Sequence, residues 1–169
     1  MTIKLRAPEP DDVDRLYMWE NDAEGGLHGH WAHAPLSRFQ IWEYVNNYDA
    51  NPATAGAVRM MVIAGDETVG TVDLYDMDLY NRRASVGIYI DPKRRGKGIG
   101  QSALEAIERY ACDTLGLHTL VAYCLSVNKV GCRAFEAQDY VLSGVMKECA
   151  RFGNRYHDIN VYVKILTSL

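Results

Sequence analysis

The feature that most constrains the fold of this chain is a series of three β-rich runs that ends in a basic, glycine-rich loop. The runs span residues 57–64, 68–77 and 84–90, and only short turns separate them. Consecutive strands joined by short turns predict an antiparallel meander. Pro92 ends the third run, and residues 93–100 then lead into a helical pattern.

The rest of the chain alternates between helical and extended patterns. The helix after the loop is predicted from apolar residues at helical spacing, which are Ala103, Leu104, Ile107, Tyr110 and Ala111. The other expected elements are a strand over 2–7, helices from Pro10 and over 37–47, a strand over 119–125, a helix over 128–137, and strands over about 140–150 and 155–165. This order predicts an α+β (mixed α/β) fold, in which about four helices flank a central, mostly antiparallel sheet of about six to seven strands.

Composition and charge limit the class of protein. The chain has 169 residues, of which 48% are hydrophobic and 24% charged, which is typical of one soluble domain. The formal net charge of −4 argues against nucleic-acid binding and mildly favours a cationic ligand. We find no apolar signal core in residues 1–6 and no membrane-length apolar stretch, so we expect a cytoplasmic protein without a membrane partner.

The four cysteines lie far apart and form no C-x-x-C pair. Because such spacing does not suit a metal site or a disulfide framework, we expect buried, reduced thiols. They are Cys112, Cys124, Cys132 and Cys149.

The loop over residues 91–100 is the most informative motif. Its glycines allow backbone N–H groups to converge at a helix start, where anions are favoured, so the loop suits a pyrophosphate. Arg94, Arg95 and Lys97 add positive charge around it. No P-loop run occurs, and a dinucleotide fingerprint would need glycine where Gln101 stands. A basic turn without a ligand is the alternative interpretation.

The run Arg95-x-x-Gly98-x-Gly100, after a strand that ends in Asp91-Pro92, resembles the acetyl-CoA loop of the GNAT superfamily of N-acetyltransferases. The second half of that family's pattern follows at the right distance. Asn128 begins a helix after an apolar strand, and Phe135-Glu136 and Asp139-Tyr140 stand where the family has its Tyr-Glu and Gly-Phe pairs.

Further segments resemble one branch of the family, which holds the ribosomal-protein N-terminal acetyltransferases and the spermidine N-acetyltransferases. These segments are residues 5–12, 70–74, 82–84 and 152–158, so the resemblance extends over essentially the whole chain. It is nearest to the spermidine enzymes. It implies a GNAT-type twisted sheet in a single domain, residues 1–169, that transfers an acetyl group from acetyl-CoA to a primary amine. That amine would be a polyamine such as spermidine or, alternatively, a protein N-terminus, and a homo-oligomer would fit the branch.

The resemblance also implies where acetyl-CoA binds, with no metal. Main-chain groups of the third β-rich run would pair with the pantetheine arm, amides of the loop would hold the pyrophosphate, and the start of the later helix would contact the cofactor further along. The implied cofactor residues are Ile88, Tyr89, Ile90, Arg95, Gly96, Lys97, Gly98, Ile99, Gly100, Asn128 and Lys129.

The expected general acid is missing. Phe135 occupies the position where the family commonly has a tyrosine that protonates the leaving thiolate, and its ring has no proton to give. Three interpretations stay open. The thiolate leaves without an acid, since its pKa is only about 8.5; or Tyr140 or Tyr123 donates instead; or the protein is a CoA-binding sensor without turnover.

For the amine side, Asp73 is the first candidate as a base or amine binder, because the spermidine branch tends to carry an acid there. Asp76, on the same strand, is a first candidate for the amine pocket as well. Tyr75 shares a strand face with Asp73, and Ser85 replaces a second family carboxylate. The alternative is that Asp73 is an exposed, hydrated side chain on the strand with no functional role, and the sequence fits this interpretation about as well. The N-terminal helical region also carries an acidic rim, which consists of Glu20, Asp22, Glu24 and Glu43. This rim would suit a polyamine, and a solvated helix face explains it equally well.

A histidine run, His28, His30 and His33, lies between the first two helical patterns. No carboxylate or cysteine completes a metal site at familiar spacing, so we expect this loop to line the acceptor pocket and to bind no metal.

Overall fold

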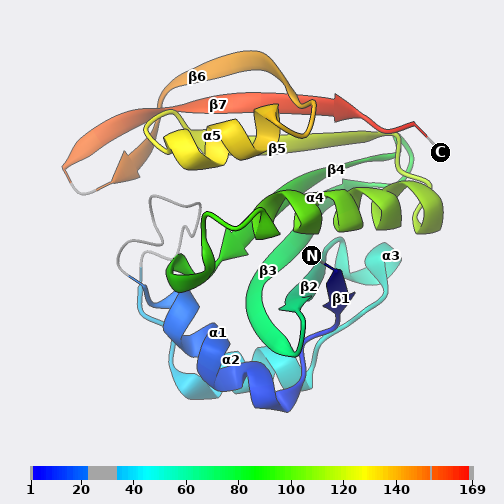
Figure 1. Ribbon diagram of the computed structural model, residues 1–169, viewed down its shortest axis with the longest axis vertical. Helices are drawn as coiled ribbons and strands as arrows, with labels where there is room; N and C mark the ends of the chain where they lie inside the picture. The colour runs from blue at the N-terminus through cyan, green and yellow to red at the C-terminus, as the bar shows by residue number, and fades with distance from the viewer. Residues whose placement is uncertain (1, 23–33, 153, 168–169) are drawn as a thin grey trace.

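The computed structural model describes residues 2–22, 34–152 and 154–167. Its centre is a seven-stranded sheet with the strand order β1-β2-β3-β4-β5-β7-β6 (Figure 1). The strands are β1 (Ile3–Arg6), β2 (Val58–Ala64), β3 (Glu67–Asp78), β4 (Arg83–Ile90), β5 (Thr119–Leu125), β6 (Val141–Phe152) and β7 (Arg155–Ile165). The α-helices of the described chain are α1 (Val13–Glu20), α2 (Arg38–Asn46), α3 (Pro52–Ala55), α4 (Ile99–Arg109) and α5 (Lys129–Glu136), and short 3₁₀ helices span Pro10–Asp12 and Pro92–Arg94.

The sheet is mostly antiparallel, as predicted. Every neighbouring pair of strands runs antiparallel except β4 and β5, which are parallel. The three β-rich runs form the meander β2-β3-β4, and the crossover through α4 brings β5 alongside β4. The predicted fold class is therefore confirmed.

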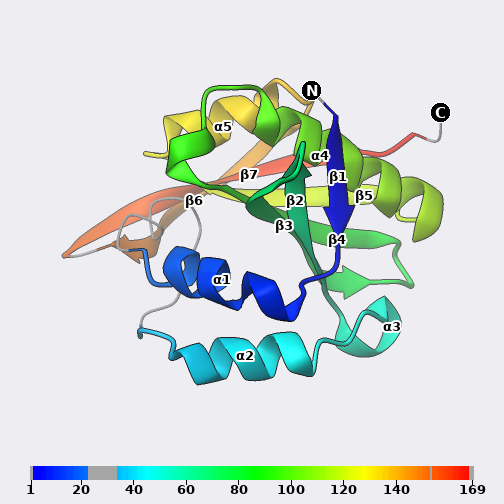
Figure 2. The ribbon, with the colours of Figure 1, turned by 60° about the horizontal axis from the view of Figure 1, so that its bottom comes forward.

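The helices cover both faces of the sheet. Figure 2 shows α1 and α2 on one side and α4 and α5 on the other. The α4 side holds the larger apolar core, in which Leu104 and Ile107 are fully buried. On the other side, Leu16, Trp19 and Ile41 join α1 and α2 to the sheet. Burial of one apolar stripe on each helix explains why helical spacing was readable in the sequence.

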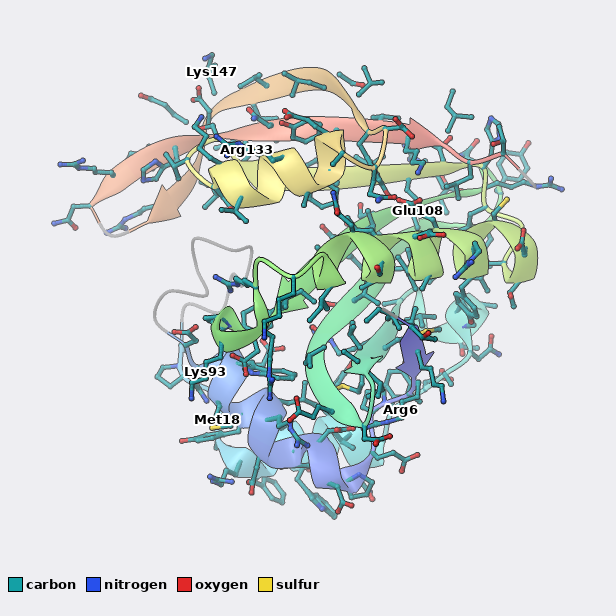
Figure 3. The ribbon with its side chains drawn as sticks, viewed as in Figure 1. Arg6, Met18, Lys93, Glu108, Arg133 and Lys147 are labelled. Carbon is teal, nitrogen blue, oxygen red and sulfur yellow. The ribbon has the colours of Figure 1, made fainter. Side chains whose placement is uncertain are left out.

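An ion pair links the first strand to the turn before α1. Arg6, labelled in Figure 3, donates from Nη1 and Nη2 to the two carboxylate oxygens of Asp12, at 2.5 and 2.9 Å. Asp12 also accepts from the Glu9 amide and is fully buried. Burial alone would raise the pKa of Asp12, but the hydrogen bonds from Arg6 and Glu9 outweigh it and lower this pKa. The pair fixes the position of α1 against the sheet.

Three local features differ from the sequence prediction. The short helix α3 lies in a segment for which no element was predicted, and α4 continues into a π turn over Tyr110–Thr114. Cys124 and Cys132 are buried as expected, Cys112 is only partly buried, and the described cysteines are all free thiols. Cys149, however, is exposed, because it lies on β6, the edge strand, where most side chains face solvent. No described helix has the length and apolar character to cross a membrane.

Candidate acetyl-donor and acceptor site

The sheet opens between its two parallel strands. Residues 83–85 of β4 pair with 119–121 of β5, and no pair joins the two strands beyond that point. β4 nevertheless stays paired with β3 as far as Ile90, and β5 stays paired with β7 as far as Leu125. The two strands thus separate while each keeps its outer partner, which leaves facing strand edges that can accept main-chain hydrogen bonds from a ligand.

A cavity of about 400 Å³ continues this opening toward the start of α4. The loop glycines Gly96 and Gly98 have φ values of 78° and 74°, a left-handed conformation that glycine adopts at little cost. Gly98 is the N-cap of α4, and Arg95 Nε donates to the Ile90 carbonyl at 2.9 Å, which ties the loop to the strand end. The cavity is lined by Ile88, Tyr89, Ile90, Arg94, Arg95, Gly96, Gly98, Ile99, Gly100, Gln101, Asn128, Val130, Gly131, Arg133 and Ala134.

These residues fit an extended anionic ligand such as CoA. The exposed start of a helix, two left-handed glycines and three arginine side chains lie along one cavity, next to an unpaired strand edge. Among the predicted cofactor residues, all but Lys97 and Lys129 line it, and those two lysines are exposed side chains beside it. Arg133, labelled on α5 in Figure 3, was not predicted.

A second cavity, of about 300 Å³, lies on the α1 side of the opening, and we call it the acceptor cavity. It shares four lining residues with the first cavity: Ile88, Tyr89, Asn128 and Gly131. Its other lining residues are Glu20, Arg59, Asp73, Tyr75, Val86, Gly87, Tyr123, Cys124, Leu125 and Phe135. The two cavities therefore meet at the separated strands.

One cross-strand row forms the polar side of the acceptor cavity. Arg59 on β2 is opposite Asp73 on β3, and Asp73 is opposite Gly87 on β4. Gly87 has no side chain, and a Cβ there would lie 3.5 Å from the Tyr75 ring. The absence of a side chain at Gly87 keeps the space beside Asp73 open.

Arg59 is held by two carboxylates. Its Nε and Nη2 donate to the two oxygens of Asp73 at 2.8 and 3.0 Å, and its Nη1 donates to Glu20 Oε1 at 2.6 Å. Burial opposes the charge of Arg59, but Asp73 and Glu20 outweigh this effect and raise the pKa of the guanidinium. The cluster of two carboxylates and one guanidinium carries a formal charge of −1.

The predicted acceptor residues divide into two groups. Asp73 and Tyr75 line the acceptor cavity, and burial raises the pKa of Tyr75 to about 12, so its hydroxyl stays protonated at neutral pH. Asp76 and Glu43 are exposed and line none of the described cavities. Glu20, expected only as part of an acidic rim, lines the cavity. The histidine run and Glu24 lie outside the described residues.

Phe135 and the two tyrosines considered as general acids, Tyr140 and Tyr123, differ in their position relative to the acceptor cavity. Phe135 lines the acceptor cavity and packs edge-on against Tyr140, with ring centroids 5.2 Å apart. Tyr140 itself is buried and lines none of the described cavities, and burial strongly raises its pKa. It lies near Glu108, which rises from α4 toward the strands in Figure 3 and pairs with Lys164 at 2.6 Å. Tyr123, in contrast, lines the cavity with its side chain partly exposed.

Sequence reasoning missed Arg59, Gly87 and Gly131. A signal for Arg59 was present, because a charged residue in the apolar run of residues 58–63 needs a buried partner. The two glycines fall inside a predicted strand and a predicted helix, where a glycine indicates close packing, but the sequence does not show which side chains approach them. Within the described ranges, no three His, Cys, Asp or Glu side chains are grouped so as to hold a metal ion.

A family model described as an acetyltransferase (GNAT) domain matches residues 2–140. The spermidine N(1)-acetyltransferase of Vibrio cholerae is 24% identical over 159 residues, which cover 93% of this chain and 89% of that protein. The ribosomal-protein-serine acetyltransferase of Escherichia coli is 25% identical over 112 residues, which cover 66% of this chain and 63% of that enzyme's length.

Solved structures share the fold at lower identity. The spermidine N-acetyltransferase from Vibrio cholerae in complex with CoA and spermine superposes with a TM-score of 0.85, at 22% identity over 97% of this chain and 95% of that one. A ribosomal L7/L12 α-N-protein acetyltransferase in complex with CoA superposes with a TM-score of 0.86. Its sequence is 20% identical, and the match covers 98% of this chain and 95% of that one. The family match and the shared fold lead to one conclusion, which agrees with the resemblance seen in the sequence. This chain is a member of the acetyltransferase (GNAT) domain family.

Proposed function

We propose that this chain is an acetyl-CoA-dependent N-acetyltransferase that acylates a primary amine, and that residues 1–169 form its single domain. The observation that carries the proposal is the junction of the two cavities. The opening between β4 and β5 leads directly to a cavity walled by Glu20, Arg59 and Asp73. Acetyl-CoA is the acyl donor of the family to which the chain belongs.

Different residues of the chain bind the acetyl donor and the amine. The unpaired edge of β4 and the amides at the start of α4 hold the donor, which supplies a thioester-activated acetyl group. The acceptor cavity binds the amine, and its carboxylates favour the ammonium form on entry. An alkyl ammonium with a pKa near 10.4 must lose a proton before it attacks, so a carboxylate or water chain beside it assists.

Departure of the thiolate does not depend on Phe135, whose ring has no acidic proton. Tyr123 is the hydroxyl donor we assign here, because it lines the acceptor cavity and Tyr140 does not. A thiolate with a pKa near 8.5 also leaves with little help. General acid catalysis contributes about 10²–10⁴-fold, so a poorly placed acid slows such an enzyme without abolishing it.

The acceptor we propose is a cationic amine, with a polyamine such as spermidine first. The negative charge of the Glu20–Arg59–Asp73 cluster supports a cation, and the names of two similar proteins point to spermidine and to ribosomal proteins. A protein N-terminus is therefore the alternative acceptor. We place the protein in the cytoplasm, where both kinds of acceptor occur.

A CoA-binding sensor without turnover is the alternative from another class, and the observation that favours it is Phe135. Release of free CoA thiol from acetyl-CoA tests the proposal, with a panel of spermidine, spermine, simple diamines and short N-terminal peptides. Release with polyamines supports the leading acceptor, and release with peptides alone supports the alternative acceptor. Binding of acetyl-CoA without release for any amine would contradict the enzymatic proposal and favour the sensor.

A further inference from the structure

We propose that Tyr75 sets the size limit for the acceptor amine, because its ring closes one end of the acceptor cavity. This inference rests on the proposed function, since it names the residue that selects among amines at the same site. Two cavities adjoin on the face of the sheet that carries α1 and α2, and Tyr75 lines both of them. Its ring therefore stands where a longer or bulkier amine would pass from one cavity into the other.

The second of these is a third cavity of about 570 Å³, which lies beyond the acceptor cavity at the C-terminal end of α2. It is larger than the acceptor cavity, whose volume is about 300 Å³. Three residues line both cavities and form the wall between them, namely Arg59, Asp73 and Tyr75. The other lining residues are mostly apolar or aromatic, which suits a hydrocarbon or aryl group. They are Tyr44, Asn47, Tyr48, Asp49, Ala55, Ala57, Val58 and Leu74.

Tyr75 is the wall residue whose loss would open the wall without breaking an ion pair. Arg59 and Asp73 hold each other through two hydrogen bonds, at 2.8 and 3.0 Å, and charge-assisted forks of this kind are among the strongest contacts in proteins. Among the described residues, none forms a hydrogen bond with the Tyr75 hydroxyl. The barrier at Tyr75 is therefore the bulk of its ring.

The ring of Tyr75 lies over Gly87 of β4. A Cβ on Gly87 would lie 3.5 Å from Tyr75 Cε1, which is an ordinary van der Waals contact. Tyr75 itself is opposite Ser85, and Ser85 is the last residue of β4 that pairs with β5. The ring thus covers the strand just beyond the point where the sheet opens, beside the path of an amine that approaches the acetyl group.

An irregular stretch of backbone fixes the direction of this side chain. Asp76, the next residue, has a φ of 50°, a left-handed conformation that is uncommon for residues other than glycine. The register between β3 and β4 shifts between Tyr75 and Asp78, which marks a β-bulge. The Met77 amide donates to the carbonyl of Gly56, the C-cap of α3, at 3.1 Å. Bulges and strained residues are frequent where a sheet directs a side chain into a site, so they support a specific role for Tyr75.

The wall predicts which amines the protein accepts. A linear diamine should fit in the acceptor cavity beside Tyr75, whereas an amine with an aromatic ring at its far end needs the space beyond. Loss of the Tyr75 ring joins the two cavities and supplies that space. One methylene group in an apolar pocket already changes kcat/KM by about 10- to 200-fold, so exclusion of a whole ring is easily measured.

The test compares the wild type with Tyr75→Ala, using putrescine and N-benzylputrescine as amines. Both present the same free primary amine, but only the second carries an aromatic ring at its far end. The wild type should prefer putrescine by about tenfold or more in kcat/KM, and Tyr75→Ala should reduce this preference to about threefold or less. The KM for acetyl-CoA should stay unchanged, because Tyr75 does not line the donor cavity.

Tyr75→Phe and Tyr80→Ala are the matched controls, and both should keep the preference for putrescine. Tyr75→Phe retains the ring and removes only the hydroxyl. Tyr80 is 94% exposed in the turn after β3, so Tyr80→Ala controls for the loss of a tyrosine elsewhere on the same hairpin. If Tyr75→Ala unfolds, Tyr75→Val replaces it, since valine suits a strand but lacks the ring.

Equal use of the two amines by the wild type overturns the inference, and so does an unchanged preference in Tyr75→Ala. A preference lost in either control overturns it as well, because the ring of Tyr75 would then not be the barrier.

If the wild type releases no thiol with any amine, the proposed function fails, and calorimetry with the CoA-loaded protein still decides the inference. Weaker binding of N-benzylputrescine than of putrescine by the wild type, with this difference lost in Tyr75→Ala, supports the role of Tyr75. Equal binding of the two amines by the wild type, binding of neither, or a difference that persists in the variant overturns it.

Discussion

Asn128 and Gly131 fit closely together where the two cavities meet. The Oδ1 atom of Asn128 accepts from the Gly131 amide at 2.9 Å and caps α5, as an N-cap asparagine does. A Cβ on Gly131 would lie 2.6 Å from Asn128 Nδ2 and 3.0 Å from Cys124 Sγ. The cap thus requires a glycine, and it orients a residue that lines both cavities.

Gly131→Ala should break this arrangement. The added methyl group would displace the Asn128 side chain, so we expect a loss of about 1–2 kcal/mol in the free energy of unfolding and weaker acetyl-CoA binding. Urea unfolding and calorimetry measure the two effects. Gly144→Ala on β6 is the control, because a Cβ there meets no atom within 4 Å. Equal stability of the two variants would show that the cap does not need the glycine.

Gly87→Leu should block the acceptor side alone. A leucine side chain would project into the acceptor cavity beside Asp73 and Tyr75, so kcat/KM for the amine should fall at least about a hundredfold, an amount typical of misplaced substrates. Gly87→Ala, whose Cβ makes an ordinary 3.5 Å contact with Tyr75, should be much milder. Acetyl-CoA affinity by calorimetry should change little in either variant. A leucine variant with normal amine kinetics would remove Gly87 from the acceptor site.

Phe135→Tyr should raise kcat if departure of the thiolate limits the rate. Phe135 lines the acceptor cavity, so the new hydroxyl would supply an acid there, and we expect a gain of about ten- to a hundredfold, within the usual range of general acid catalysis. Tyr123→Phe should lower kcat by a similar factor. Rapid-quench and steady-state rates measure both. Unchanged rates in both variants would mean that the thiolate leaves unaided.

The Arg6–Asp12 ion pair should make the free energy of unfolding depend on pH in the acid range. The pKa of Asp12 is lowered in the folded protein, so its contribution is present above the unfolded-state pKa of about 3.9 and is lost as the pH falls through the folded pKa. Asp12→Asn should cost about 1–3 kcal/mol at pH 7, because Arg6 loses a buried charged partner. The free energy of unfolding of Asp12→Asn should then fall less than that of the wild type between pH 5 and about pH 2.5, a range that extends below the unfolded-state pKa.

Urea unfolding at the two pH values tests this, and Asp11→Asn serves as the control, because Asp11 is an exposed neighbour in the same turn. A parallel decline of the wild type and Asp12→Asn would assign the acid sensitivity to other groups.

Most of the fold was readable from the sequence because its elements carry strong local patterns. The meander β2-β3-β4 and the helix α4 follow from alternation, turn residues and helical spacing of apolar side chains. The helix α3 was missed because its four residues are too few to show a period. Cys149 was misjudged because its exposure depends on the place of β6 at the sheet edge, which is a property of the tertiary fold.

The candidate site was predictable on the donor side and much less so on the acceptor side. The loop over residues 91–100 is one continuous segment, and its glycines and charged residues are close together in the sequence. The acceptor cluster joins Glu20, Arg59 and Asp73 from three separate elements, so only the packing of α1 on the sheet brings them together. Gly87 matters through its cross-strand register with Asp73, which a single sequence does not contain.

The separation of β4 from β5 has a consequence for how this protein can change over evolutionary time. Between residues 86 and 90, the edge of β4 that faces the opening consists of peptide groups that are not paired with β5. Peptide groups are the same in every sequence, so side chains along this strand can change as long as its path persists and residue 87 stays small enough to leave the acceptor cavity open. Selection at such a surface acts on the course of the main chain. A course of this kind outlasts the side chains, which agrees with a fold held in common at only 20–22% identity.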